Sequence, residues 1–437
     1  MRSRTVPFLL VVAVAIATFA VLMVSPASGA QVTDQIISNP NFSGQPALIG
    51  KRHIAVSGSL SAILYLDPTG HPWVYLRDGS TGASGHVQLP QVSGTNWSAV
   101  SYVLRSRADL WVLAGSGPVQ LREYRLDGTG LPTSATLLSS TTLGDSDSRP
   151  DDIVALASGV VVGVWHQQGS SGPQGLRVSY WSPSTSAWTS LAPMTFMPTF
   201  ASKFVVVQHP ADGSIWIFGN PDSWTAIGAA HLTEVSGALR VDWTNGSFIS
   251  SADGAFNADP ENPDLEVAPD PAAGTVTLTY QRAQRKMFST NPVVTGSYLA
   301  LAAIRADGTK SFVSLDEYVE RVSSLGLTVL PSERWVSYRP IQPDLSFSTL
   351  FMRRESAGAW DAPIQLGTLY SPYQPVLTNP GASEVVARMS DGKVHLYSAG
   401  AGASSGPTAS PSPTPTSSSS PSPSPTPTAS CKAKKCH

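Results

Sequence analysis

Two clusters of acidic side chains stand out in this chain, of which only 13% is charged. Paired carboxylates are the groups that glycoside hydrolysis needs, one as acid and the other as base or nucleophile. Arg149 lies within the first cluster, where its charge would lower the pKa of nearby carboxyl groups and favour a base or an ion ligand. The first cluster contains Asp145, Asp147, Asp151 and Asp152, and the second contains Asp259, Glu261, Asp264 and Glu266. We take Asp151, Asp152, Asp264 and Glu261 as the candidate catalytic residues.

Turn formation is the alternative role for these acids. Each cluster includes a Pro-Asp corner, and an aspartate beside proline commonly bonds the following backbone amides. The string Asp145-Ser146-Asp147 resembles the opening of a calcium loop, although Arg149 and the missing glycine depart from that pattern. The sequence therefore predicts no cofactor, and calcium is the one ion that it leaves open.

A few aromatic and basic side chains are candidates for binding a ligand. Trp97, Trp181 and Trp224 lie near expected loops, where an indole ring can stack on a sugar. His166 stands at the end of an expected strand, and Arg149 lies at a Pro-Asp corner. Packing between sheets is the alternative for each tryptophan, and a structural role is the alternative for the histidine.

Other classes of site are excluded by what the chain lacks. It contains no HExxH string, no phosphate loop and no dinucleotide fingerprint, and its eight histidines are scattered. The net charge is −2 and no basic stripe is interleaved with aromatic residues, so nucleic acid is not an expected partner. Residues 402–406 match a nucleophile-elbow string, but no strand precedes them and no helix follows, so we discard that match.

A recurring strand-turn-strand unit must position the candidate residues. In each copy a Pro-Asp corner leads into an apolar strand, a glycine turn and a second apolar strand, as in residues 150–165 and 263–280. Such a repeat predicts an all-β chain folded as a single β-propeller of four-stranded blades over residues 50–399. We count seven blades, with six as the alternative. The last unit has three clear strands, and the lead-in at 31–49 is expected to supply the fourth.

One helix is predicted within this array, near residues 314–325. Ser314 and Glu317 fit a capping box, in which each side chain bonds a backbone amide of the first turn. Val319 and Val322 then share one face with Leu315, at helical spacing. The helix is interpreted as an insertion that either walls a pocket or packs on one rim.

The two ends of the chain read as targeting and linker segments. Residues 1–30 have a charged start, an apolar stretch and small residues before Gln31, as a cleaved signal peptide does, with an uncleaved anchor as the alternative. Residues 400–430 are rich in Ser, Pro and Thr and form an expected linker. The short basic tail at 431–437 contains Cys431 and Cys436, which could pair within one chain or between chains.

The blade strings resemble the repeats of sialidase-like (BNR-type) propellers. The resemblance rests on residues 262–270 with 274–280, residues 149–151 with 159–162, and the outer-strand residues Trp188 and Trp360. It implies the propeller fold and glycan-related surroundings. The chain has no Asp-box and no Phe-Arg-Ile-Pro string, and the arginine triad and Tyr-Glu pair of sialidases have no matching positions, so sialidase activity is not implied.

These patterns together favour a secreted propeller that binds a polysaccharide or a cell-surface protein. A secreted glycoside hydrolase or lyase that uses carboxylates on the blade-connecting loops is the alternative, and a purely structural envelope protein is a third. The expected location is extracellular, with association to the cell envelope left open. We expect a monomer with no membrane span after signal cleavage.

Overall fold

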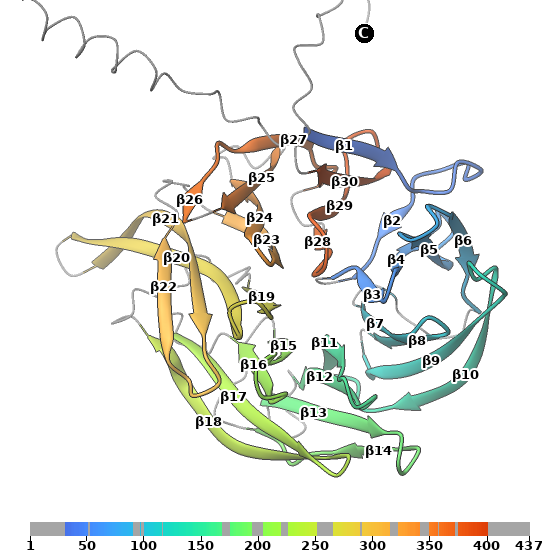
Figure 1. The fold of residues 1–437 in the computed structure, drawn as a ribbon, viewed down its shortest axis with the longest axis horizontal. Helices are drawn as coiled ribbons and strands as arrows, with labels where there is room; N and C mark the ends of the chain where they lie inside the picture. The colour runs from blue at the N-terminus through green and yellow to red at the C-terminus, as the bar shows by residue number, and fades with distance from the viewer. Residues whose placement is uncertain are drawn as a thin grey trace, which may run out of the picture. The chain divides into compact units, whose positions relative to one another are not determined.

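The chain folds into seven small antiparallel sheets that stand in a ring (Figure 1). The computed structural model describes residues 31–50, 53–90, 97, 100–115, 117–167, 175–194, 204–219, 226–250, 265–288, 291–314, 322–340, 349–356, 358–371 and 375–400. The predicted all-β propeller is confirmed, with seven blades rather than six. The predicted signal peptide, linker and cysteine-containing tail lie outside the described residues and stay predictions.

Blades one to four follow one another along the chain, and each runs from an inner to an outer strand. Blade one contains β2 (Ala47–Leu48), β3 (Ala55–Ser57), β4 (Leu60–Leu66), β5 (Pro72–Asp78) and β6 (Ser84–Gln88). Blade two contains β7 (Val100–Ser106), β8 (Asp109–Ala114), β9 (Gln120–Asp127) and β10 (Ser134–Thr142). Blade three contains β11 (Ser148–Ala155), β12 (Val161–Gln167), β13 (Gly175–Ser182) and β14 (Ala187–Ser190). Blade four contains β15 (Phe204–Gln208), β16 (Ile215–Gly219), β17 (Ala226–Val235) and β18 (Ala238–Ser250).

Blades five to seven complete the ring. Blade five contains β19 (Leu265–Asp270), β20 (Thr275–Phe288), β21 (Asn291–Ile304) and β22 (Lys310–Ser314). Blade six contains β23 (Val322–Leu330), β24 (Glu333–Pro340), β25 (Thr349–Ser356), β26 (Ala359–Trp360) and β27 (Ile364–Thr368). Blade seven contains β28 (Leu377–Thr378), β29 (Glu384–Arg388), β30 (Val394–Gly400) and β1 (Gln31–Ile36).

The middle strands are apolar on both faces because a neighbouring blade covers each face. Every residue of β12 (VVGVWHQ) and of β16 (IWIFG) is buried. The outer strand β10 instead alternates between exposed and half-buried residues. The core therefore consists of hydrophobic layers between adjacent blades, and such layers favour continuous apolar runs over strict alternation.

The N-terminal strand closes the ring. β1 pairs antiparallel with β30, from Gln31 opposite Gly400 to Ile36 opposite His395, and in Figure 1 the blue β1 lies beside the dark red β30. The imidazole of His395 contacts Asp34 of β1 through Nδ1 at 2.8 Å. This pairing covers the edge of β30, which would otherwise present unpaired backbone groups to other chains.

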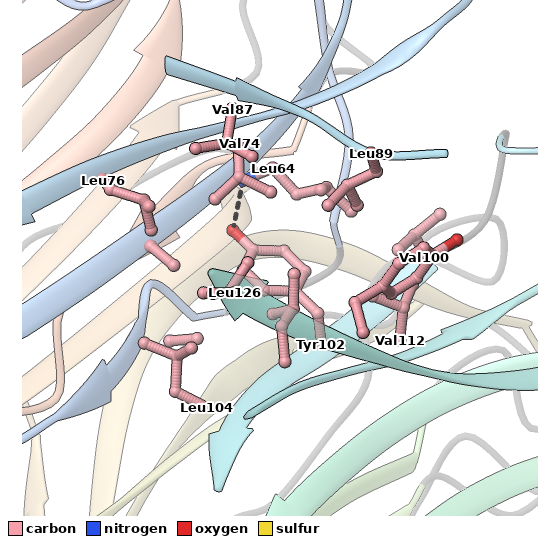
Figure 2. Close-up of a cluster of buried hydrophobic side chains, with 14 of the residues drawn as sticks. Leu64, Val74, Leu76, Val87, Leu89, Val100, Tyr102, Leu104, Val112 and Leu126 are labelled. Carbon is pink, nitrogen blue, oxygen red and sulfur yellow. Dashed lines mark hydrogen bonds between the residues drawn. The ribbon is translucent and has the colours of Figure 1, made fainter. Parts of the chain in front are cut away.

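The inner strand of blade one is interrupted, and a tyrosine from blade two fills the gap. β2 pairs with β4 at Tyr65 and β3 pairs with β4 at Ala62, which leaves Leu64 without a strand partner on that edge. The backbone nitrogen of Leu64 donates to the hydroxyl of Tyr102 at 3.1 Å, the dashed line in Figure 2. Gly50 permits this approach, because a Cβ there would lie 2.9 Å from the Tyr102 ring. The two blades are therefore joined by a buried polar contact as well as by apolar packing.

The helix predicted over 314–325 is absent at both of its ends. Ser314 is the last residue of β22, and Val322 begins β23. Gly326 pairs with Ser337 of β24, and Leu325 is 2% exposed in a core cluster. Strand pairing satisfies these backbone groups and buries the leucine, which outweighs the local helical spacing. Residues 315–321 lie outside the described residues, and no described helix is long and apolar enough to cross a membrane.

Candidate functional site

A buried histidine–aspartate pair lies at one end of blade three. His166 Nδ1 is 2.6 Å from Asp151 Oδ2, and the side chains are 5% and 0% exposed. His166 is the last residue but one of β12, so the pair lies where β11 begins and β12 ends, which we call the entry end of the blade. A register shift between Pro150 and Asp152 leaves Asp151 as an extra residue in β11. Such a bulge re-aims the side chain, here toward the imidazole.

The second ring nitrogen of His166, Nε2, is buried, and nothing among the described residues hydrogen-bonds to it. The Asp151 carboxylate accepts a hydrogen bond from Nδ1, so Nε2 is the ring nitrogen that no side chain engages. An imidazole that a carboxylate orients in this way is the usual form of a histidine general base.

Arg149 adds a positive charge beside this pair. It lies directly opposite His166 in the β11–β12 register, so both side chains are on the same face of the sheet. Arg149 is exposed, whereas His166 is buried. The structure therefore brings together three residues that the sequence suggested for separate reasons: an acid, a histidine and an arginine.

Asp152 has a different environment from its neighbour. Its Oδ2 accepts from the backbone nitrogen of Val206 in blade four at 2.7 Å. Its Oδ1 accepts from the backbone nitrogen of Ile153 at 3.0 Å and from the hydroxyl of Ser101 in blade two at 3.3 Å. The Asp152 carboxylate is 2% exposed and accepts hydrogen bonds from donors in three blades. This environment favours a structural role for Asp152 over a catalytic one.

The candidate tryptophans that the structure describes pack against other side chains. Trp97 is 4% exposed and lies under the guanidinium of Arg122, 5.3 Å from its ring centre. Trp181 packs against Trp111 in a tilted arrangement, with 5.2 Å between ring centres, and the guanidinium of Arg105 lies 4.8 Å from the Trp181 ring centre. Both rings are largely occupied by these contacts. Trp224, Glu261 and Asp264 lie outside the described residues, so their predicted roles stay predictions.

Sequence reasoning missed two polar residues at the same end of blade three. Gln167 donates through Nε2 to Asp145 Oδ2 and accepts at Oε1 from Arg177 at 2.8 Å. Burial lowers the pKa of Arg177, and the Asp145 charge opposes part of that change. The available signal was positional, since Gln167 ends β12 and Arg177 lies near the start of β13, where both interrupt apolar strands. In the described ranges, no three His, Cys, Asp or Glu side chains are grouped as metal ligands would be.

Comparison with known proteins defines the class of fold. No protein-family model matches the chain, and no curated protein matches it. A polysaccharide lyase described as an ulvan lyase is similar in structure, with 9% identity, a TM-score of 0.50, and coverage of 82% of this chain and 95% of that one. An oligogalacturonate lyase from Vibrio parahaemolyticus has 11% identity, the same TM-score, and coverage of 84% and 97%.

At such low identity these likenesses show the fold alone. The chain is a seven-bladed β-propeller with a buried histidine–aspartate pair at the entry end of its third blade. The propeller structures that resemble it include polysaccharide lyases. The sialidase-like resemblance of the repeats stays a prediction, because no family model matches.

Proposed function

We propose that this protein is an exported polysaccharide lyase, with His166 as the base that takes a proton from a uronate sugar. Nε2 removes the proton on the carbon next to the carboxylate. The electron pair left behind forms the new C=C bond, the glycosidic C–O bond breaks, and the leaving oxygen takes a proton from solvent. The observation that carries the proposal is the 2.6 Å contact between Asp151 and His166, with Nε2 left unbonded among the described residues.

Each of the three clustered residues has a part in this reaction. Asp151 holds the imidazole in the required tautomer and stabilises the imidazolium once the proton has moved. Arg149, opposite His166, neutralises the uronate carboxylate and so stabilises the negative charge that develops as the proton leaves. An arginine suits this part because its planar guanidinium can bind a carboxylate through two hydrogen bonds.

Elimination fits the side chains better than hydrolysis does. A glycoside hydrolase needs two available carboxyl groups, one of them as a proton donor. Asp151 is bonded to the imidazole and Asp152 to three donors, so neither is placed as that pair requires. The lyases among the similar structures add support of a weaker kind, since a fold hosts many activities. The export signal expected at residues 1–30 accords with a polymer outside the cell.

The test is incubation of the purified protein with a panel of uronate-containing polysaccharides. Cleavage by elimination gives an unsaturated product that absorbs ultraviolet light, and H166N should abolish that signal. H231N is the matched control, because His231 contacts Asp242 at 3.0 Å in blade four, away from the site. Reducing sugar released without ultraviolet absorbance would indicate a hydrolase instead. Binding without cleavage would leave the protein as a secreted polysaccharide-recognition module.

A further inference from the structure

A cavity of about 360 Å³ opens at the entry end of blade three, and neither His166 nor Asp151 is among its lining residues. Successive residues of a strand point to opposite faces, so Trp165 and Gln167 face away from the side that His166 occupies. His166 lies beside Phe204 of blade four, whereas Trp165 packs in a cluster with Trp111 of blade two. The cavity is therefore distinct from the histidine–aspartate site, although both lie at the same end of the blade.

A chain of polar groups lines this cavity. The guanidinium of Arg177 donates to Gln167, whose amide donates in turn to Asp145. Gln167 is 6% exposed, and its two partners fix which end of the amide is the oxygen. Asp145 is itself held, because its Oδ1 accepts from the backbone of Asp147 at 3.0 Å and from the hydroxyl of Ser148 at 3.1 Å. The polar wall is thus rigid before any ligand arrives, which lowers the entropy lost on binding.

A glycine lets the chain pass close to the Trp165 ring of the cavity lining. Gly144 lines the cavity, and a Cβ at this position would lie 2.3 Å from Ser148 Oγ and 2.9 Å from the Trp165 ring. The chain passes so close to Trp165 that any side chain would have to displace the indole or the serine. Trp165 and Leu191 supply the apolar part of the lining.

We infer that this cavity binds one neutral sugar unit of the polysaccharide, an inference that rests on the proposed function. Arg177 and Asp145 bring one charge of each sign, so the lining favours neither an anion nor a cation. Guanidinium, amide and carboxylate groups supply the donors and acceptors that a ring of hydroxyl groups requires. The indole and Leu191 match the apolar faces of such a ring, and the volume lies at the lower end of the range for small-ligand pockets.

The experiment titrates the purified protein with methyl glycosides of neutral hexoses, and with glucuronate and glucosamine for comparison, by ligand-observed NMR. Binding of a single sugar involves no cleavage, so this result is independent of the lyase assay. We expect at least one neutral glycoside to bind more tightly than both charged sugars. R177Q and G144A should each weaken that binding by about tenfold or more, since one removes a charged donor and the other displaces the Trp165 ring of the lining.

The control is R334Q. Arg334 lines a cavity of about 340 Å³ at the opposite end of blades five and six, and this change should leave binding unaltered. Thermal unfolding would show whether G144A is folded, and R177Q provides the test if it is not. The inference is overturned if no neutral glycoside binds, if a charged sugar binds more tightly, if R177Q binds as the unaltered protein does, or if R334Q abolishes binding. If the unaltered protein binds a neutral glycoside but cleaves no uronate polysaccharide, the result counts against the proposed function and not against the sugar site.

Discussion

The carboxylate of Asp152 in blade three accepts a hydrogen bond at 2.7 Å from the backbone nitrogen of Val206 in blade four. Because its other oxygen reaches Ser101 in blade two, a single side chain ties three neighbouring inner strands together. In the part of the chain that the structure describes, the seven blades are separate sheets, and no ladder joins the inner strands of neighbouring blades. Contacts of this kind therefore supply directional links across boundaries that are otherwise held by apolar packing.

Replacing Asp152 by alanine should destabilise the propeller by about 3 kcal/mol, because buried donors in blades two, three and four lose their acceptor. D152N keeps one oxygen and should cost less than D152A. Urea unfolding followed by tryptophan fluorescence measures both changes. An unaltered midpoint for D152A would show that the three blades do not depend on this carboxylate.

The hydroxyl of Tyr102 should be needed for the joint between blades one and two. Y102F would leave the buried nitrogen of Leu64 without an acceptor, at a cost of about 1–3 kcal/mol, while keeping the ring packing of Figure 2. V235A is the control, because Val235 is 56% exposed and its change should stay within about 0.5 kcal/mol. Equal unfolding midpoints for the two variants would contradict this account.

Ring closure should depend on β1. Removing residues 31–36 would expose the edge of β30, which now pairs with six residues of β1. We expect a lower melting temperature and concentration-dependent association, since an exposed strand edge recruits other chains. Calorimetry and light scattering at several concentrations measure both effects. A truncated protein that melts like the intact one and stays monomeric would disprove the expectation.

The turn at Asp67 should make stability depend on acid pH. Burial raises the pKa of this carboxyl, but hydrogen bonds from Thr69, His71 and Trp73 outweigh that effect and hold it below its ordinary value of 3.8. A lowered folded-state pKa contributes stability above the ordinary value, and that stability is lost as the pH falls through the folded-state pKa. The stability difference between the intact protein and D67N should therefore shrink as the pH falls below about 3.8. Urea titrations at a series of pH values would reveal a constant difference if the carboxylate plays no such role.

Substitutions at Asp151 and Arg149 separate the roles assigned to these residues in the lyase reaction. D151N should lower kcat roughly 100-fold or more, because an amide partner no longer secures the imidazole tautomer. R149Q should lower kcat/KM on a uronate polymer by a similar factor, and R149K should recover part of it. Initial rates from ultraviolet absorbance measure these effects. Full activity in R149Q would show that Arg149 does not take part in the reaction.

Much of the fold could be predicted because its signals are local. Apolar runs such as residues 160–165 and glycine turns between them indicate strands whichever sheet they enter. The helix prediction was wrong because Leu325 and Gly326 belong to β23, which pairs with β24. The spacing of apolar residues within 314–325 does not reveal a pairing with another segment.

The sequence by itself determined the propeller class, the blade repeat and a short set of chemically capable residues at its Pro-Asp corners. Only the tertiary structure decided which of those residues lie at the candidate site and which hold the blades together. Asp151 and Asp152 are neighbours in the chain, yet a bulge in β11 turns one toward His166 and leaves the other bonded to Ser101 and Val206. The physical reason is that strand register and blade contacts, which join residues far apart in the chain, set the direction of each carboxylate.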